Sequence, residues 1–218
     1  MPKVYLSPSM QEDNKGVGEF GSEMLRAYQV ARLVEDYLTP KGCRVRLPDK
    51  AWATLAPSTT LAKVTNDSNE WRASVHVCLH TNAASDPKVG GTGIWHHPES
   101  DAGHRLATLI YKRLAVVSPG EDKGLFHNPV FYETSHAHAP VAYIEAVFHT
   151  NPAEAKDYVF ARKLYAWAIA AGILEFLDLD VPVKPLASFQ KIVVPVPMRP
   201  APWWGELQDY LARVDKTG

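Results

Sequence analysis

Cysteine is scarce in this sequence, and long apolar runs and an excess of charge of either sign are missing. The chain of 218 residues has two cysteines, too few for a framework of disulfides. Its apolar runs fall well short of the ~18 consecutive residues that a membrane-spanning helix needs. The 23 Lys and Arg residues nearly balance the 24 Asp and Glu residues. This balance argues against nucleic acid and anionic membranes as partners, because both attract basic proteins.

The beginning of the sequence also lacks an apolar segment of the length found in signal peptides. We therefore expect synthesis in a cytoplasm. What the chain does have is 46% hydrophobic residues, enough for a substantial core. Its length corresponds to one domain of ordinary size with room for an appendage.

Strand-like and helix-like segments alternate over about the first 178 residues. Strands are expected at 3–7, 43–47, 74–80, 92–96 and 141–147, and helices at 22–38, 59–71, 100–116 and 152–177. This alternation predicts an α/β fold with a twisted, largely parallel sheet and helices on both faces. Such sheets bind ligands at the carboxyl ends of their strands.

The composition changes after Asp180, where prolines interrupt any regular element. We predict a folded domain over residues 1–178, followed by a Pro-rich linker and a short amphipathic helix within 179–218. The apolar face of that helix comprises Trp203, Leu207, Tyr210, Leu211 and Val214. This face should seek an apolar partner, either the folded domain or another subunit, so oligomerisation through it is one interpretation.

Three side chains stand out at expected strand and helix ends. His80 closes a buried strand, where it is well placed to hold a metal, although a simple hydrogen-bonding role is the alternative. Glu145 lies inside an apolar strand, and burying an unpaired carboxylate costs several kcal/mol unless an ion pair or a metal compensates. An apolar setting also raises a carboxyl pKa, which suits a general acid/base. Glu23 opens a helix, where an acidic residue is also favoured by the helix dipole alone.

Taken together and in this order, these segments resemble the zinc-dependent N-acetylmuramoyl-L-alanine amidases of bacteria and their phages. The resemblance covers about residues 3–177. Segment 79–83, LHTNA, matches the family's second-histidine motif, and segment 144–152, IEAVFHTNP, is similar to the part that carries its catalytic glutamate. Glu23 matches a glutamate ligand, and segment 97–107 resembles a strand-to-helix junction of the family.

One departure concerns the family's usual first zinc ligand, a histidine just after the first strand. Here that segment reads SPSMQEDN and holds no histidine. Met10 occupies the position, but a thioether suits Cu(I) better than zinc. The third ligand is therefore Gln11, Glu12, or no protein group. Gln11 is favoured because it is neutral, like the histidine it would replace, and leaves the net +1 of a site with two histidines and one glutamate.

The resemblance implies one Zn²⁺ per chain, with Glu23 and His80 as ligands and Glu145 as the general acid/base, and Gln11 is the favoured third ligand. Asn82, His149 and Asn151 are expected on the substrate side. The implied activity is hydrolysis of the amide between N-acetylmuramic acid and L-alanine, and the implied partner is peptidoglycan. An endolysin or an autolysin, acting on the wall after release, fits this activity. The alternatives are a zinc peptidase that cuts the stem peptide and a non-catalytic wall-binding module.

Overall fold

The structure is a computed structural model of the chain, and it describes residues 1–121 and 123–185. Its centre is a six-stranded sheet with the strand order β2-β1-β3-β6-β4-β5. The strands are β1 (Lys3–Pro8), β2 (Arg44–Arg46), β3 (Val75–Asn82), β4 (Gly93–His96), β5 (Gly124–His127) and β6 (Val141–Phe148). All neighbours pair in parallel except β4 and β6, which are antiparallel. The predicted largely parallel sheet is confirmed.

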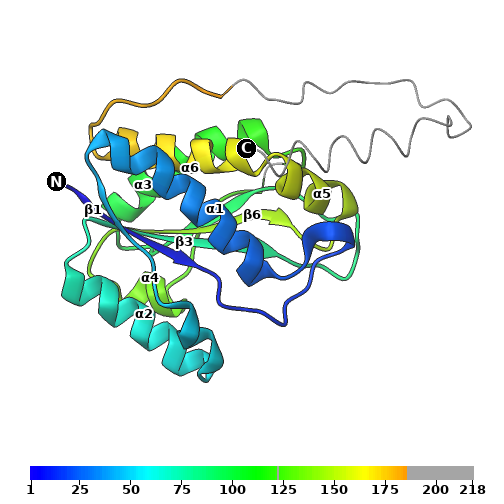
Figure 1. Cartoon of the computed structure of the whole chain (residues 1–218), viewed down its shortest axis with the longest axis horizontal. Helices are drawn as coiled ribbons and strands as arrows, with labels where there is room; N and C mark the ends of the chain where they lie inside the picture. The colour runs from blue at the N-terminus through cyan, green and yellow to red at the C-terminus, as the bar shows by residue number, and fades with distance from the viewer. Residues whose placement is uncertain (122, 186–218) are drawn as a thin grey trace, which may run out of the picture. The chain divides into compact units, whose positions relative to one another are not determined.

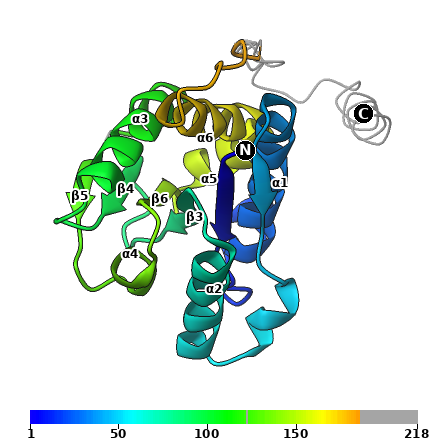
Figure 2. The same ribbon diagram turned by 90° about the vertical axis from the view of Figure 1, so that its left-hand side faces the viewer.

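Helices cover both faces of this sheet, as predicted. The helices are α1 (Glu23–Leu38), α2 (Pro57–Trp71), α3 (Asp101–Val117), α4 (Tyr132–His136), α5 (Pro152–Phe160) and α6 (Arg162–Phe176). Figure 1 shows α1, α3 and α6 above the sheet and the smaller pair α2 and α4 below it. Figure 2, turned by a quarter, shows the same division from the side, with α4 below the strands β4 and β5.

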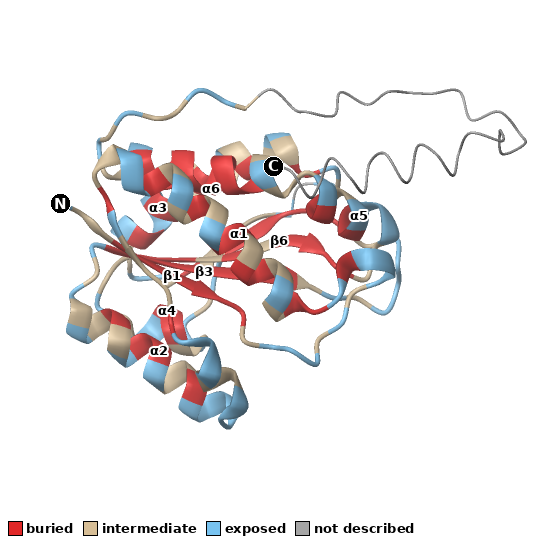
Figure 3. Ribbon diagram, viewed as in Figure 1, coloured by how far each residue is buried: buried red, intermediate tan, exposed pale blue. Residues whose placement is uncertain are grey.

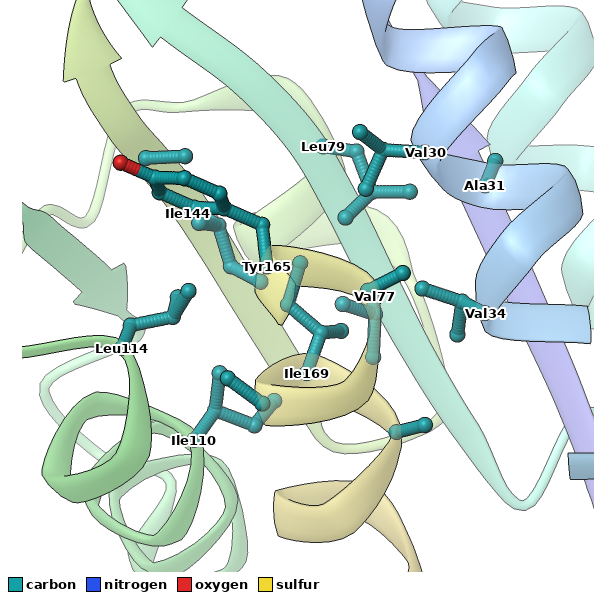
Figure 4. Packing of buried hydrophobic residues seen from close by; sticks show 14 of the residues in the cluster. Val30, Ala31, Val34, Val77, Leu79, Ile110, Leu114, Ile144, Tyr165 and Ile169 are labelled. Atoms are coloured by element: carbon teal, nitrogen blue, oxygen red, sulfur yellow. The ribbon is translucent and has the colours of Figure 1, made fainter. Parts of the chain in front are cut away.

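The two faces of the sheet differ in chemistry because successive strand residues point to opposite sides. The face beneath α1, α3 and α6 is apolar, and its side chains pack with those helices in the core seen in Figure 4, for example Val77, Leu79 and Ile144. In Figure 3 the strands β1, β3 and β6 are buried along almost their whole length. The opposite face instead carries the polar residues of the site.

Helices α3 and α6, which pack on the apolar face of the sheet, approach each other closely at one glycine. A Cβ atom added to Gly172 of α6 would lie 2.6 Å from the Cα of Ile110 in α3. Real Cβ atoms do not come so near to backbone, so the contact between α3 and α6 requires glycine at this position.

Three local features differ from the sequence expectation. Strand β5 and helix α4 were not predicted, because each spans only four or five residues and lies in a segment rich in histidine and proline. The helix expected over 152–177 is two helices, since Ala161 leaves the helical conformation with φ −96° and ψ 15°. Strand β4 runs against β6, an orientation that periodicity alone does not specify.

The chain continues along α6 after that helix ends. The indole Nε1 of Trp167 donates to the carbonyl of Pro182 over 3.0 Å. Leu179 and Val181 also pack against the core. The helix predicted around Trp203 lies outside the described residues, and the domain boundary at 178 stays a prediction. In the part of the chain that is described, no helix has the length and apolar character to span a bilayer.

Candidate active site

The first component of the site is Glu23, which the start of α1 holds in place. The hydroxyl of Ser22 accepts a hydrogen bond from the amide of Leu25, so Ser22 is the helix N-cap that the sequence predicts. Asn14 fixes Glu23 twice. Its carbonyl accepts from the amide of Glu23 over 2.8 Å, and its Nδ2 donates to Oε2 over 2.7 Å. The carboxylate is therefore both buried and oriented.

The second component is His80 at the carboxyl end of β3. Its Nδ1 lies 3.0 Å from Oε1 of Glu23, and the amide of Thr81 donates to the same oxygen over 2.9 Å. Burial alone would raise the pKa of Glu23, but the bonds from His80, Thr81 and Asn14 outweigh it and hold that pKa below its ordinary value. Burial would lower the pKa of His80, yet the hydrogen bond and charge of Glu23 raise it overall. The structure thus brings together two residues that lie far apart in the sequence.

The third component is Glu145, which is paired in register with His80 on the neighbouring strand β6. Since aligned residues of parallel strands point to the same side, its carboxylate lies beside the His80 imidazole. Burial raises the pKa of Glu145 to about 7, and the nearby charge of Glu23 adds to this effect while His80 opposes it. Its Oε2 atom is buried without a hydrogen-bond partner within the described residues. Such an atom is free to take part in proton transfer.

Further side chains support this trio, and sequence reasoning did not single them out for that role. The ring of Tyr143 stacks on His80 with centroids 4.5 Å apart and planes 14° from parallel. Tyr143 precedes Glu145 by two residues, so strand periodicity alone places both on one face. Thr81 was quoted only as part of a motif, because a backbone amide leaves no signal in the sequence.

The loop after β1 holds both candidates for a third ligand. The carbonyl of Gln11 accepts from the amide of Met24, which places this residue next to the start of α1 and to Glu23. The Gln11 side chain is exposed. The carboxylate of Glu12 instead accepts from the hydroxyl of Ser22 over 2.9 Å and from Lys15 over 3.3 Å. The choice between the two stays a prediction.

The residues expected on the substrate side have structural contacts of their own. His149 is wholly buried, with Nδ1 2.9 Å from the hydroxyl of Thr81 and its ring near Phe20. Asn151 caps α5 by accepting from the amides that follow it. Asn82 accepts from its neighbour's amide and lies where the pairing of β3 and β6 is irregular. Substrate contact by these residues stays a prediction, and the burial of His149 favours a positioning role.

A second polar group lies deeper on the same face of the sheet. His76, Cys78 and Glu133 bring three donor atoms within 4.8 Å of one another, so they too could hold a metal ion. All three are buried, and their hydrogen bonds are mutual: His76 Nε2 lies 3.0 Å from Glu133 Oε1, which also accepts from Ser7. The other ring nitrogen of His76 lies 2.9 Å from the hydroxyl of Ser68 in α2. This group ties α2 and α4 to the sheet.

Both groups offer donors of the kinds that zinc binds, and of the two, the pair Glu23 and His80 is the one whose histidine is in register with Glu145. The carboxylate oxygen of Glu23 and the ring nitrogen of His80, which are hydrogen-bonded over 3.0 Å, are donors of the kinds that zinc binds. They stand next to a carboxylate with an unpartnered oxygen and a raised pKa. A metal-assisted hydrolysis with a carboxylate as base needs this combination.

Comparison with known proteins gives a consistent result. Residues 4–175 match a family model described as N-acetylmuramoyl-L-alanine amidase. No curated protein matches the chain. Among solved structures, the chain is similar to the catalytic domain of CwlV, an N-acetylmuramoyl-L-alanine amidase from Bacillus (Paenibacillus) polymyxa var. colistinus. That match has a TM-score of 0.72 and 21% identity, and it covers 83% of this chain and 100% of that one.

Two further structures show the same likeness. An N-acetylmuramoyl-L-alanine amidase from Clostridium difficile 630 matches with a TM-score of 0.71 and 22% identity, over 81% of this chain and 97% of that one. AmiC2 of Nostoc punctiforme matches with a TM-score of 0.69 and 20% identity, over 81% and 97%. At such identities the structural likeness establishes the fold.

Proposed function

The chain belongs to the N-acetylmuramoyl-L-alanine amidase family, and we propose that Glu23, His80 and Glu145 carry out the family's hydrolysis of peptidoglycan in it. The bond cleaved is the amide between the lactyl group of N-acetylmuramic acid and L-alanine. One observation carries the assignment: a partly buried carboxylate, with a buried, unpartnered Oε2 atom and a raised pKa, stands beside a paired histidine and glutamate.

We propose that Glu23 and His80 hold a single zinc ion. When bound there, zinc supplies a Lewis acid for the amide carbonyl and lowers the pKa of a water molecule. Asn14 and the amide of Thr81 keep the Glu23 carboxylate in one orientation, as partners of metal-binding side chains usually do. The deeper group of His76, Cys78 and Glu133 is the alternative site, where His76 contacts Glu133 and Ser68; the pair Glu23 and His80 is preferred because His80 is in register with Glu145.

Glu145 is the proton carrier in this mechanism. Its carboxylate takes a proton from the water that attacks the lactyl carbonyl, and then delivers a proton to the departing nitrogen of L-alanine. A pKa near 7 suits both steps, because the group then gives up and accepts protons with similar ease. Tyr143 restricts the rotation of the His80 ring by stacking on it.

We propose Gln11 as the third ligand, through its amide oxygen. Its backbone lies next to the start of α1, and its side chain is exposed. The Glu12 carboxylate instead already accepts hydrogen bonds from Ser22 and Lys15. Replacing Gln11 with Ala should weaken zinc binding, with partial recovery of activity in added zinc, and Glu12→Ala should have a mild effect. The reverse ranking, measured by competition with a zinc chelator, would assign the ligand to Glu12.

Two measurements test the proposal as a whole. Digestion of purified peptidoglycan should release new L-alanine amino termini and no new reducing ends of sugars. New amino termini from another residue of the stem would instead identify a peptidase. If neither product forms, the protein is a non-catalytic wall-binding module. Metal analysis should find one zinc per chain, and His80→Ala should lose it together with activity, because the ligands bind zinc jointly.

We further propose that the protein acts on the wall after release from the cell that makes it, as an endolysin or an autolysin. The location of peptidoglycan outside the cytoplasmic membrane supports this proposal. Production of the protein in a bacterial host should then cause lysis only when the membrane is permeabilised. Lysis with an intact membrane would exclude this route.

A further inference from the structure

Four aromatic side chains form a continuous strip on the polar face of the sheet. Phe126 of β5 stacks on Trp95 of β4 with ring centroids 4.8 Å apart, and Phe131 lies 6.2 Å from Trp95. Phe131 in turn lies 4.9 Å from Tyr143 of β6, the residue whose ring stacks on His80. This aromatic strip therefore runs from the edge strand of the sheet to the proposed zinc ligand.

Gly93 brings the outer part of the strip next to the catalytic carboxylate. It pairs with Glu145 across the antiparallel strands β4 and β6, so the two residues lie side by side. A Cβ atom on Gly93 would lie 3.1 Å from the indole of Trp95 and 3.3 Å from the ring of Phe126. Both rings thus lie close to Gly93, where the missing side chain leaves room for them. Because Gly93 pairs with Glu145, the rings lie near that carboxylate.

The strip is not part of the apolar core. Its members lie on the opposite face from the packing of α1, α3 and α6, and none belongs to that core cluster. Phe126 is 38% exposed, and Trp95, Phe131 and Tyr143 are all partly exposed. Leaving apolar rings in water is unfavourable by ~25 cal/mol for each Å². A ligand that covers these rings would recover this free energy.

We propose that the aromatic strip binds the saccharide part of peptidoglycan, and this inference rests on the proposed function. The substrate extends in two directions from the scissile amide, as an uncharged or weakly charged glycan and as a stem peptide that carries carboxylates. The strip contains no cationic side chain to attract a carboxylate. It does offer flat apolar rings, onto which the C–H face of a pyranose packs well. The glycan then lies over β4 and β5, and the stem peptide extends toward β1.

Binding to a non-hydrolysing variant tests the strip directly. Glu145→Gln is combined with Phe126→Ala or with Trp95→Leu, and titrated with a soluble N-acetylglucosaminyl-N-acetylmuramoyl oligosaccharide and, separately, with the stem pentapeptide. Each change should weaken oligosaccharide binding about tenfold, the loss expected for one aromatic contact. Pentapeptide binding should not change. Phe126→Tyr and Trp95→Phe should preserve binding, which separates loss of the ring from loss of the fold.

Phe160 of α5 provides a matched control, since it is a phenylalanine that is 52% exposed away from the strip. Its replacement by Ala should affect neither titration. In otherwise wild-type protein, Phe126→Ala should raise KM for a disaccharide-pentapeptide with little change in kcat. Unchanged oligosaccharide binding in both strip variants, or an equal loss with pentapeptide, would overturn the inference. The proposed function fails separately, if the wild-type protein exposes no L-alanine amino termini.

Discussion

The chemistry of Glu145 depends strongly on its surroundings. Buried residues flank it in β6, and the resulting desolvation raises its pKa to about 7. Replacing it with Gln keeps the shape of the side chain and removes its capacity to transfer a proton. We expect turnover of peptidoglycan to fall about 10²–10⁴-fold, with the melting temperature and zinc content unchanged. Lysis near the wild-type rate would exclude Glu145 from the mechanism.

Glu133 illustrates a carboxylate with the opposite behaviour. Burial by itself would raise its pKa, but hydrogen bonds from His76 and Ser7 outweigh burial and hold the pKa below the ordinary value of 4.5. A carboxyl whose pKa is lower in the folded state than in the unfolded state stabilises the folded state at every pH above its unfolded-state pKa. This contribution is lost as the pH falls through the lower, folded-state pKa.

Glu133→Gln should therefore reduce the free energy of unfolding at pH 7 by about 1.5–3 kcal/mol, the usual contribution of hydrogen bonds to a charged group. The variant should also show a weaker loss of stability between neutral and acid pH than the wild-type protein. Urea unfolding at several pH values measures both effects. Glu70→Gln, at an exposed position of α2, is the control and should change neither.

At the scale of elements, the contact between α3 and α6 depends on a residue that helices normally disfavour. By helix propensity alone, Gly172→Ala would stabilise α6 by about 1 kcal/mol. The added Cβ would instead meet the backbone of Ile110 at 2.6 Å. We expect the clash to dominate and to lower the free energy of unfolding by about 1–3 kcal/mol. An increase in stability would show that the helices separate at little cost.

The elements themselves follow the sequence where they are long and regular. Helix α1 begins after its predicted cap Ser22, and α3 begins after Ser100 in the same way. The short elements β5 and α4 escaped prediction, although they carry Phe126 and Glu133. A segment of four or five residues holds too few positions for a period to be recognised, and packing against the sheet stabilises it instead.

At the scale of the whole molecule, the segment after α6 contributes to the folded domain. A chain that ends at Asp178 lacks Val181 and the carbonyl of Pro182, and it leaves the indole of Trp167 without that acceptor. We expect its free energy of unfolding to be about 1–3 kcal/mol lower than that of the full chain. A chain that ends at Pro185 keeps these contacts and should melt at a higher temperature than the chain that ends at Asp178. Equal melting temperatures for the two truncations would contradict this prediction.

The sequence by itself determined the alternation of strands and helices, the carboxylate within an apolar strand at 145, and the resemblance of segments 79–83 and 144–152 to an amidase. Each of these is a local pattern, set by periodicity or by one residue in an unsuitable environment. The resemblance also grouped Glu23, His80 and Glu145 in one site, but only the tertiary structure decided how they meet, with Glu23 bonded to His80 and Glu145 in register with His80. It also decided that the aromatic residues of β4, β5 and β6 form one strip. Such contacts depend on strand order and register, which arise from packing between distant segments and leave no period in the sequence.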